Sequence, residues 1–301
     1  MKRRKIIKEN IAGYLLVFPL LVSLIGFTIF PLLMALFDSF FLDYNPILTR
    51  DWSTFGLGNY IKAFETGAFQ HSMKLTLIYA VVMLPLQLAI SFFIAWKLNK
   101  DIKGIKVIRM LYFLPCVMPG IVSAMVWKYM YSAQPYGFFN SLFLEMGWPI
   151  SAFFDDPSQA VALISFMSTS IFGLAGSMPF WIAGFKSIPT SLTEAAKLDG
   201  ATGTQMMFRI ILPMMGKFIF YQLLMGLIGV FQIGQGVLTL SPGGGYDGNL
   251  NFYGLLIYNT TQGEAGFNMG YASALAYMLF VIVAILSAFT FKFNKFVYYE
   301  D

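Results

Sequence analysis

The sequence predicts an all-α polytopic membrane protein with six membrane-spanning helices, and three observations support this fold class. Of the 301 residues, 57% are hydrophobic and 12% are charged, whereas soluble proteins average about 45–50% and about 25%. Six apolar runs of 18 or more residues recur along the chain. Their flanking Lys and Arg residues gather on alternate connections, as in membrane proteins with a fixed orientation.

Each run is long enough to cross a hydrocarbon layer of about 30 Å as a helix rising about 1.5 Å per residue. The expected spans are 11–37, 75–96, 110–127, 160–185, 218–240 and 270–291. Prolines inside several runs predict kinks, because neighbouring helices can satisfy the carbonyls that a proline frees. The first run is too long for a signal peptide, so it is expected to be an uncleaved anchor. A single transmembrane domain over residues 1–301 is expected.

The positive charges predict the orientation. Placing the N-terminus inside puts 16 of the 20 Lys and Arg residues on the cytoplasmic side and 4 on the other. Basic residues are enriched in cytoplasmic connections, so both termini and the connection 186–217 are expected in the cytoplasm. This asymmetry explains the net charge of +5 without a nucleic-acid partner.

Several functions are disfavoured by what the sequence lacks. The six runs contain no Asp, Glu or His, although carriers driven by ions usually keep such a group inside the membrane. No glycine-rich phosphate loop ending in Lys and Ser or Thr is present. Active transport would therefore need a separate ATPase, and the alternative is an ion-coupled carrier or channel.

The connection between the fourth and fifth spans has its own local signals. Ser191 and Glu194 have the spacing of a capping box, and Gly200 follows Asp199 where a left-handed helix end is expected. Thr202 and Gln205 repeat the capping-box spacing, and a second short helix is expected to run to Pro213. The apolar residues of this segment need cover, either from lipid and the protein's own helices or from a docking partner; they are Leu198, Met206, Met207, Phe208 and Ile211.

This segment resembles the EAA loop of ATP-binding-cassette (ABC) importer permeases. That pattern is Glu-Ala-Ala, three residues, Gly, nine residues, Ile, one residue and Leu-Pro. The positions that match it are Glu194, Ala195, Ala196, Gly200, Ile210, Leu212 and Pro213, and Asp199 lies directly before the glycine. Other stretches, such as 13–21, 56–60 and 112–122, look like the carbohydrate-importer branch and its larger permease subunit.

The resemblance implies a type I importer architecture and a set of partners. They would be a second, homologous permease, two ATPase subunits, an extracytoplasmic solute-binding protein, membrane lipid and a carbohydrate solute. The chain itself would be a non-catalytic subunit of the bacterial cytoplasmic membrane that binds no cofactor, with ATP and magnesium on the partner ATPase. The connection 186–217 would be the coupling loop, and Glu194 would meet a basic ATPase residue. A purely structural role for Glu194 in the capping box is compatible with that contact.

The resemblance also implies a solute pathway. The sugar-binding positions of maltose-type permeases fall here on two sets of residues, Thr169, Ser170, Gly173 and Gly176 in the fourth span and Gly226, Gly229 and Val230 in the fifth. Gln222 and Ile233 share the helical face of the second set and join it. Small and polar residues in membrane helices also serve close packing, so each of these positions has that alternative role.

Overall fold

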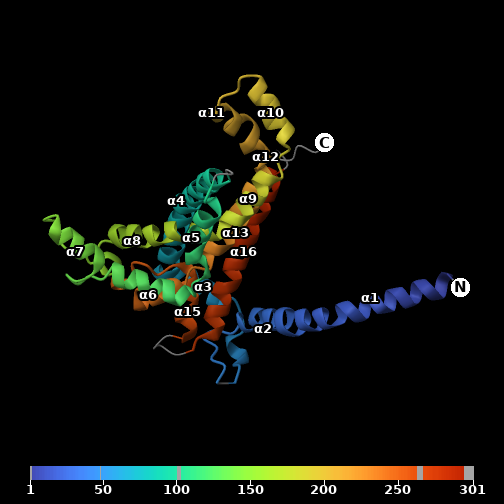
Figure 1. The fold of residues 1–301 in the computed structure, drawn as a ribbon. Helices are drawn as coiled ribbons and strands as arrows, with labels where there is room; N and C mark the ends of the chain where they lie inside the picture. Colours follow the sequence, from blue (N-terminus) through green and yellow to red (C-terminus); the bar gives the residue numbers. More distant parts are fainter. Residues whose placement is uncertain (1, 48, 100–102, 263–266, 295–301) are drawn as a thin grey trace. The chain divides into compact units, whose positions relative to one another are not determined.

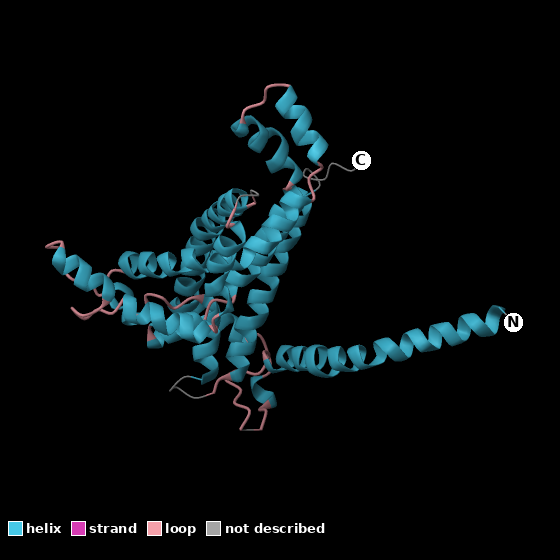
Figure 2. Cartoon of the chain, in the orientation of Figure 1, coloured by secondary structure: helices cyan, strands magenta, loops and turns pink. Residues whose placement is uncertain are grey.

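The computed structural model describes residues 2–47, 49–99, 103–262 and 267–294, and over these residues it contains helices and connections but no named strand (Figure 1, Figure 2). The predicted all-α class is confirmed. The chain forms two compact units. One contains Met1–Thr66 and Thr260–Met278, and the other contains Gly67–Asn259 and Leu279–Asp301.

The first unit begins with a long apolar helix. Its elements are α1 (Lys2–Leu24), a π-helical turn (Ile25–Ile29), α2 (Phe30–Asp38), a short 3-10 turn (Trp52–Thr54), α3 (Gly58–Glu65) and the start of α16 (Met269–Asn294). The connection after α2 is fixed by Asn59, whose buried amide donates hydrogen bonds to the carbonyls of Ser39 and Phe41 at 3.0 and 2.8 Å. Lys62 Nζ lies 2.5 Å from Asp43 Oδ1, and this hydrogen-bonded ion pair lowers the pKa of the Asp43 carboxyl.

The second unit is built around α4 (Gly67–Leu98), the longest helix of 32 residues. Its other elements are α5 (Ile105–Val117), α6 (Gly120–Met130), α7 (Phe138–Glu145), α8 (Gln159–Phe172), a 3-10 turn (Gly173–Ser177), α9 (Met178–Lys186), α10 (Thr190–Leu198), α11 (Gly203–Met206), a π-helical turn (Met207–Ile211), α12 (Leu212–Met214), α13 (Gly216–Phe231), α14 (Gln235–Leu240) and most of α15 (Tyr253–Gln262). Helix α4 packs against α9 and α13, and α14 packs against α6.

Two apolar clusters hold this unit together. The first surrounds Tyr79, Phe166 and Phe252, whose rings pack with centroids 5.1–5.6 Å apart. The second surrounds Phe92 and the fully buried Trp181, and it reaches the segment after α11 through Met207 and Ile211. Packing against Phe92 and Trp181 therefore fixes the position of the segment that follows α11.

The helices differ from six uninterrupted spans. Among the described residues, three helices are long and apolar enough to cross a membrane, namely Gly13–Asp38, Gly67–Leu98 and Met269–Lys292, or up to five if each bent pair is counted as one span. The expected third span, 110–127, is two helices bent by 93°, because Pro119 lacks an N–H and favours extended backbone at Met118. The fourth is interrupted at 173–177 and the fifth after Phe231. The count of six stays a prediction.

Candidate functional site

The first candidate site is the helical hairpin of residues 190–214, which projects beyond the ends of α9 and α13 (Figure 1). Its first arm, α10, starts at Thr190, with Pro189 at the N-cap and no side-chain cap. The predicted Ser191–Glu194 capping box is therefore wrong. Pro189 fixes φ at −58° and begins the helix early, so Ser191 lies in the first turn rather than at the cap. Glu194 and Ala195 are exposed.

The turn of the hairpin confirms the predicted left-handed glycine. Gly200 has a φ of +78°. Its N–H donates to the carbonyl of Lys197 at 3.1 Å, and the N–H of Ala201 donates to that of Ala196 at 2.9 Å. These two bonds form a Schellman motif. Asp199, the last residue before the glycine, keeps a right-handed conformation, and Ala196 is buried.

The second arm starts with the predicted capping box. The N–H of Thr202 donates to Gln205 Oε1 at 2.8 Å, and the N–H of Gln205 donates to Thr202 Oγ1 at 3.3 Å. The arm then passes through the π-helical turn (Met207–Ile211) directly into α12, and Pro213 lies just after this turn, in the last three residues of the arm. Ile210 and Leu212 are half-buried, and Pro213 is exposed.

The two arms differ in how they are held. Met207 and Ile211 of the second arm are buried in the Trp181 cluster. On the first arm, Leu198 is 89% exposed. Of the apolar residues that needed cover, the protein's own helices therefore take some, while Leu198 and Phe208 stay exposed. The hairpin therefore has one anchored arm and one largely exposed arm, which is its free arm.

The second candidate site is a cavity of about 370 Å³ at the bend between α5 and α6. Hydroxyl groups come from Ser123, Thr169 and Ser170, and ring surface comes from Trp127 and Phe166. The remaining lining residues are Pro115, Cys116, Met118, Gly120, Ala124, Val126, Gly236 and Leu240. Apolar walls with a few fixed polar groups are typical of small-molecule sites.

Two of the three hydroxyls of the cavity, those of Thr169 and Ser170, are oriented by hydrogen bonds. Thr169 Oγ1 donates to the carbonyl of Phe166 at 2.8 Å, and Ser170 Oγ accepts from the Tyr79 hydroxyl at 2.7 Å. A hydroxyl has one donor and two acceptor sites, so each keeps capacity for a solute. No lining residue carries a charge.

The structure places the predicted pathway residues in different surroundings. Thr169 and Ser170 line the cavity, and a side chain at Gly176 would lie 3.2 Å from Cys116 Sγ. Gly173 starts the 3-10 turn, and its surroundings lie outside the described residues.

The five predicted residues of the fifth span do not line this cavity. Gln222 is half-buried, Val230 belongs to the first apolar cluster and Ile233 packs against it. A Cβ at Gly226 would lie 2.3 Å from Leu84 Cδ1, whereas one at Gly229 would meet nothing within 4 Å. Their contact with solute stays a prediction.

Sequence reasoning missed Ser123, Trp127 and Gly236. Ser123 and Trp127 are four residues apart and share one face of α6, a spacing that was visible in the sequence. The bend that turns this face toward α8 and α14 depends on contacts between distant segments, which a single sequence does not reveal.

Comparisons with known proteins identify the family. No protein-family model matches the chain. A probable ABC transporter permease of Bacillus subtilis, YesP, is 34% identical over 100% of this chain and 96% of its own length. The chain belongs to the ABC transporter permeases. The predicted resemblance is confirmed, and the permease is a multi-pass membrane protein.

Other relatives of the permease have names that state a solute. The trehalose/maltose permease MalF of Thermococcus litoralis is 28% identical over 96% of this chain and 95% of its own length. The sn-glycerol-3-phosphate permease UgpA of Rhizobium meliloti is 26% identical over 97% of both chains. Among solved structures, a chain of a bacterial alginate ABC transporter in complex with its pentasaccharide-bound periplasmic protein matches with a TM-score of 0.83, 20% identity and 97% coverage of both chains. That match supports the fold of the permease.

Proposed function

We propose that this chain is one of two permease subunits of a binding-protein-dependent ABC importer that moves a neutral carbohydrate into the cytoplasm. The observation that carries the solute assignment is the cavity at the α5–α6 bend, where three hydroxyl groups and the Trp127 ring line an uncharged space. Sugars are bound by hydroxyl groups and apolar ring faces, and fixed polar groups in an apolar cavity give orientation.

A phosphorylated polyol is the second candidate, because UgpA is named for sn-glycerol-3-phosphate. A phosphate group is normally met by Arg, Lys or a helix N-terminus. Of these groups the cavity has only a helix N-terminus, that of α6 at Gly120, and no cationic side chain lines it. This favours a neutral sugar over a phosphate ester.

The remaining parts of the proposal follow from the hairpin. Its free arm exposes Glu194, Ala195 and Leu198, and it would dock on a separate ATPase that holds ATP and magnesium, so this chain needs no cofactor. The hairpin then lies in the cytoplasm together with both termini of a six-span, type I permease in the bacterial cytoplasmic membrane. The basic residues at 186–217 support this orientation.

The test is transport by the purified complex in liposomes. An ABC ATPase, a second permease and a binding protein should be needed for uptake, and neutral oligosaccharides should be taken up in preference to sn-glycerol-3-phosphate. Trp127→Ala should lower sugar uptake, while Trp148→Ala, at an exposed tryptophan outside the cavity, should not. Preferred uptake of the phosphate ester would reject the neutral-sugar assignment. Uptake that survives ATPase inactivation but collapses with the proton gradient would favour the ion-coupled carrier.

The fifth-span residues can be tested in the same assay. Gly229 is exposed and has open space around it, so Gly229→Leu adds a side chain without a clash. Blocked uptake with an intact complex would place Gly229 on the solute pathway. Normal uptake of the same sugar would remove it from the pathway.

A further inference from the structure

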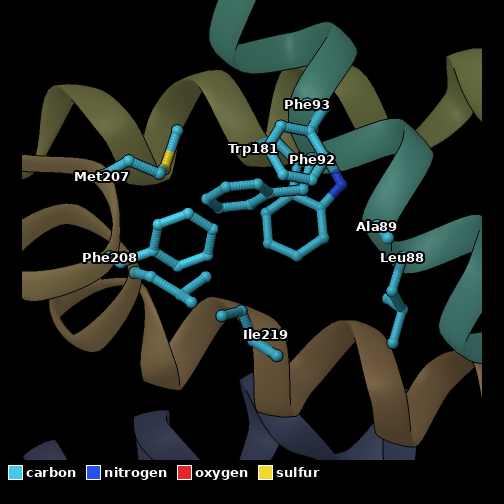
Figure 3. A pocket seen from close by; sticks show the side chains of 9 residues that line it. Leu88, Ala89, Phe92, Phe93, Trp181, Met207, Phe208 and Ile219 are labelled. Carbon is cyan, nitrogen blue, oxygen red and sulfur yellow. The ribbon is translucent and has the colours of Figure 1, made fainter. Parts of the chain in front are cut away.

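A second cavity, of about 260 Å³, lies between the spanning helices and the hairpin, and no part of the transport mechanism uses it. Figure 3 shows the rings of Phe92, Phe93, Trp181 and Phe208 gathered around it. The other lining residues are Leu88, Ala89, Met207, Leu212 and Ile219. They come from α4, α9, the second arm of the hairpin and the first turn of α13.

The lining of this cavity selects hydrocarbon. All nine lining side chains are apolar or aromatic, and the indole N–H of Trp181 is already donated to Ser91 Oγ at 3.0 Å. A cavity with such a lining stays dry and accepts apolar ligands. Phe93 is 44% exposed and Phe208 55% exposed, so the cavity can be reached from outside the helices.

Three basic residues lie close in the sequence to residues that line the cavity. Arg209 directly follows Phe208, Lys97 lies one helical turn after Phe93, and Lys217 lies in the first turn of α13, two residues before Ile219. All three are exposed, and none forms an ion pair with another described residue. Helix α4, helix α9 and residues 203–231 contain no Asp or Glu. The cavity therefore has an apolar interior, and the elements that line it carry basic residues but no acidic ones.

We propose that this cavity binds an acyl chain of an anionic phospholipid, with its headgroup at Arg209, Lys97 and Lys217. Basic pockets between membrane helices on the cytoplasmic side bind anionic headgroups, and the chain would fill the apolar interior. The lipid would contact α4, α9 and the second arm of the hairpin at once. Its occupancy would then set how firmly that arm is held, independently of the solute carried.

The test uses tryptophan fluorescence of the complex in lipid nanodiscs, because Trp181 lines the cavity. Phosphatidylcholine discs receive equal fractions of bromine-labelled phosphatidylglycerol or bromine-labelled phosphatidylcholine. We expect stronger quenching by phosphatidylglycerol, and Trp181→Phe should remove that excess. Ala89→Phe fills the cavity from an exposed position of α4. This variant should abolish the excess quenching by phosphatidylglycerol although Trp181 is still present.

The headgroup site has its own variant. Arg209→Gln should weaken the preference for phosphatidylglycerol about fivefold, the effect of removing one cation near a membrane surface. The matched controls are Val81→Phe and Lys74→Gln, at exposed positions of α4 that do not line the cavity, and both should behave as wild type.

Two results would overturn the proposal. Equal quenching by both lipids, unaffected by Ala89→Phe, would mean that only bulk lipid touches this face. Preferential quenching in the isolated chain that disappears in the complex would mean that a helix of a partner subunit occupies the cavity instead.

Discussion

The hairpin and the helices behind it both contain glycines that a larger residue cannot replace freely, but the physical reasons are opposite. Gly200 of the hairpin has a φ of +78°, and a Cβ there would meet nothing within 4 Å. Gly254 of α15 has a φ outside the left-handed region, yet a Cβ there would lie 2.6 Å from the carbonyl oxygen of Ile233. In the hairpin the backbone angle excludes other residues, and in the helices close packing does.

This difference decides what a substitution reports. A side chain at Gly200 strains only the turn, so its effect should appear in the motion of the hairpin. A side chain at Gly254 would push the first turn of α15 away from the backbone of Ile233, which lies just after the end of α13. Its effect should appear in the stability of the whole second unit.

The largest expected effect is that of Gly254→Ala. The contact atom belongs to the backbone and cannot rotate away, so we expect a loss at or above the upper end of the range of about 1–3 kcal/mol for overpacking. The measurement is the apparent melting temperature and monodispersity of the full chain in detergent. Gly229→Ala is the control, because nothing lies within 4 Å of a Cβ there. Equal melting temperatures for the two variants would contradict the close contact.

Gly226→Ala should have the next largest effect on the melting temperature. Its Cβ would lie 2.3 Å from Leu84 Cδ1, at the end of a side chain that can move, so the loss should fall near about 1 kcal/mol. Leu84→Ala removes the obstructing atoms and should make the double variant lose less than the sum of the single losses. Strict additivity in melting temperature would show that the two residues do not collide. Because a side chain at Gly226 clashes with Leu84, a transport defect in a Gly226→Leu variant would not by itself identify a solute contact.

Gly200→Val should impair coupling but leave the melting temperature nearly unchanged, because its strain falls on an exposed turn outside the two apolar clusters. A left-handed residue with a Cβ costs about 1–2 kcal/mol, and a β-branched one costs the most. In the reconstituted complex, solute-stimulated ATP hydrolysis should no longer be accompanied by a matching rate of solute uptake. Gly203→Val is the matched control, because Gly203 also lies in open space but has no positive φ. If both variants stay fully coupled, the hairpin is not the coupling element.

The hairpin also shows what the sequence could predict and why. Gly200 and the Thr202–Gln205 box follow from residues within a few positions of each other, so local rules were sufficient. The same rules placed a capping box at Ser191 and missed the effect of Pro189. A kink was predicted from the prolines of 110–127, but the cavity with Trp127 was missed, because neither the 93° size of the bend at Pro119 nor the helices it faces follow from the apolar run. The packing of Gly226 on Leu84 joins two helices that are distant in sequence.

A smaller, local effect should separate the two arms. Thr202→Ala removes the observed cap of the second arm and should cost about 1 kcal/mol, while Ser191→Ala removes no cap and should cost nearly nothing. Hydrogen exchange of the amides in each arm is the measurement. Faster exchange near residue 205 only in Thr202→Ala is expected. Faster exchange of the first arm in Ser191→Ala would show that a cap forms there after all.

The smallest effect on stability, and the most direct test of docking, comes from Glu194. Since the first arm has no side-chain cap and Glu194 is exposed, Glu194→Ala should change neither the melting temperature nor the exchange of the arm. Any loss of ATPase pull-down must then come from contact between subunits. Glu194→Gln removes the charge and keeps the shape of the side chain. If Glu194 forms an ion pair with a basic ATPase residue, both variants should weaken the pull-down. High salt screens exposed charges and should then reduce the difference between each variant and wild type. Unchanged pull-down and coupling in both variants would remove Glu194 from the interface and leave Leu198, 89% exposed at the end of the same arm, as the residue to test there.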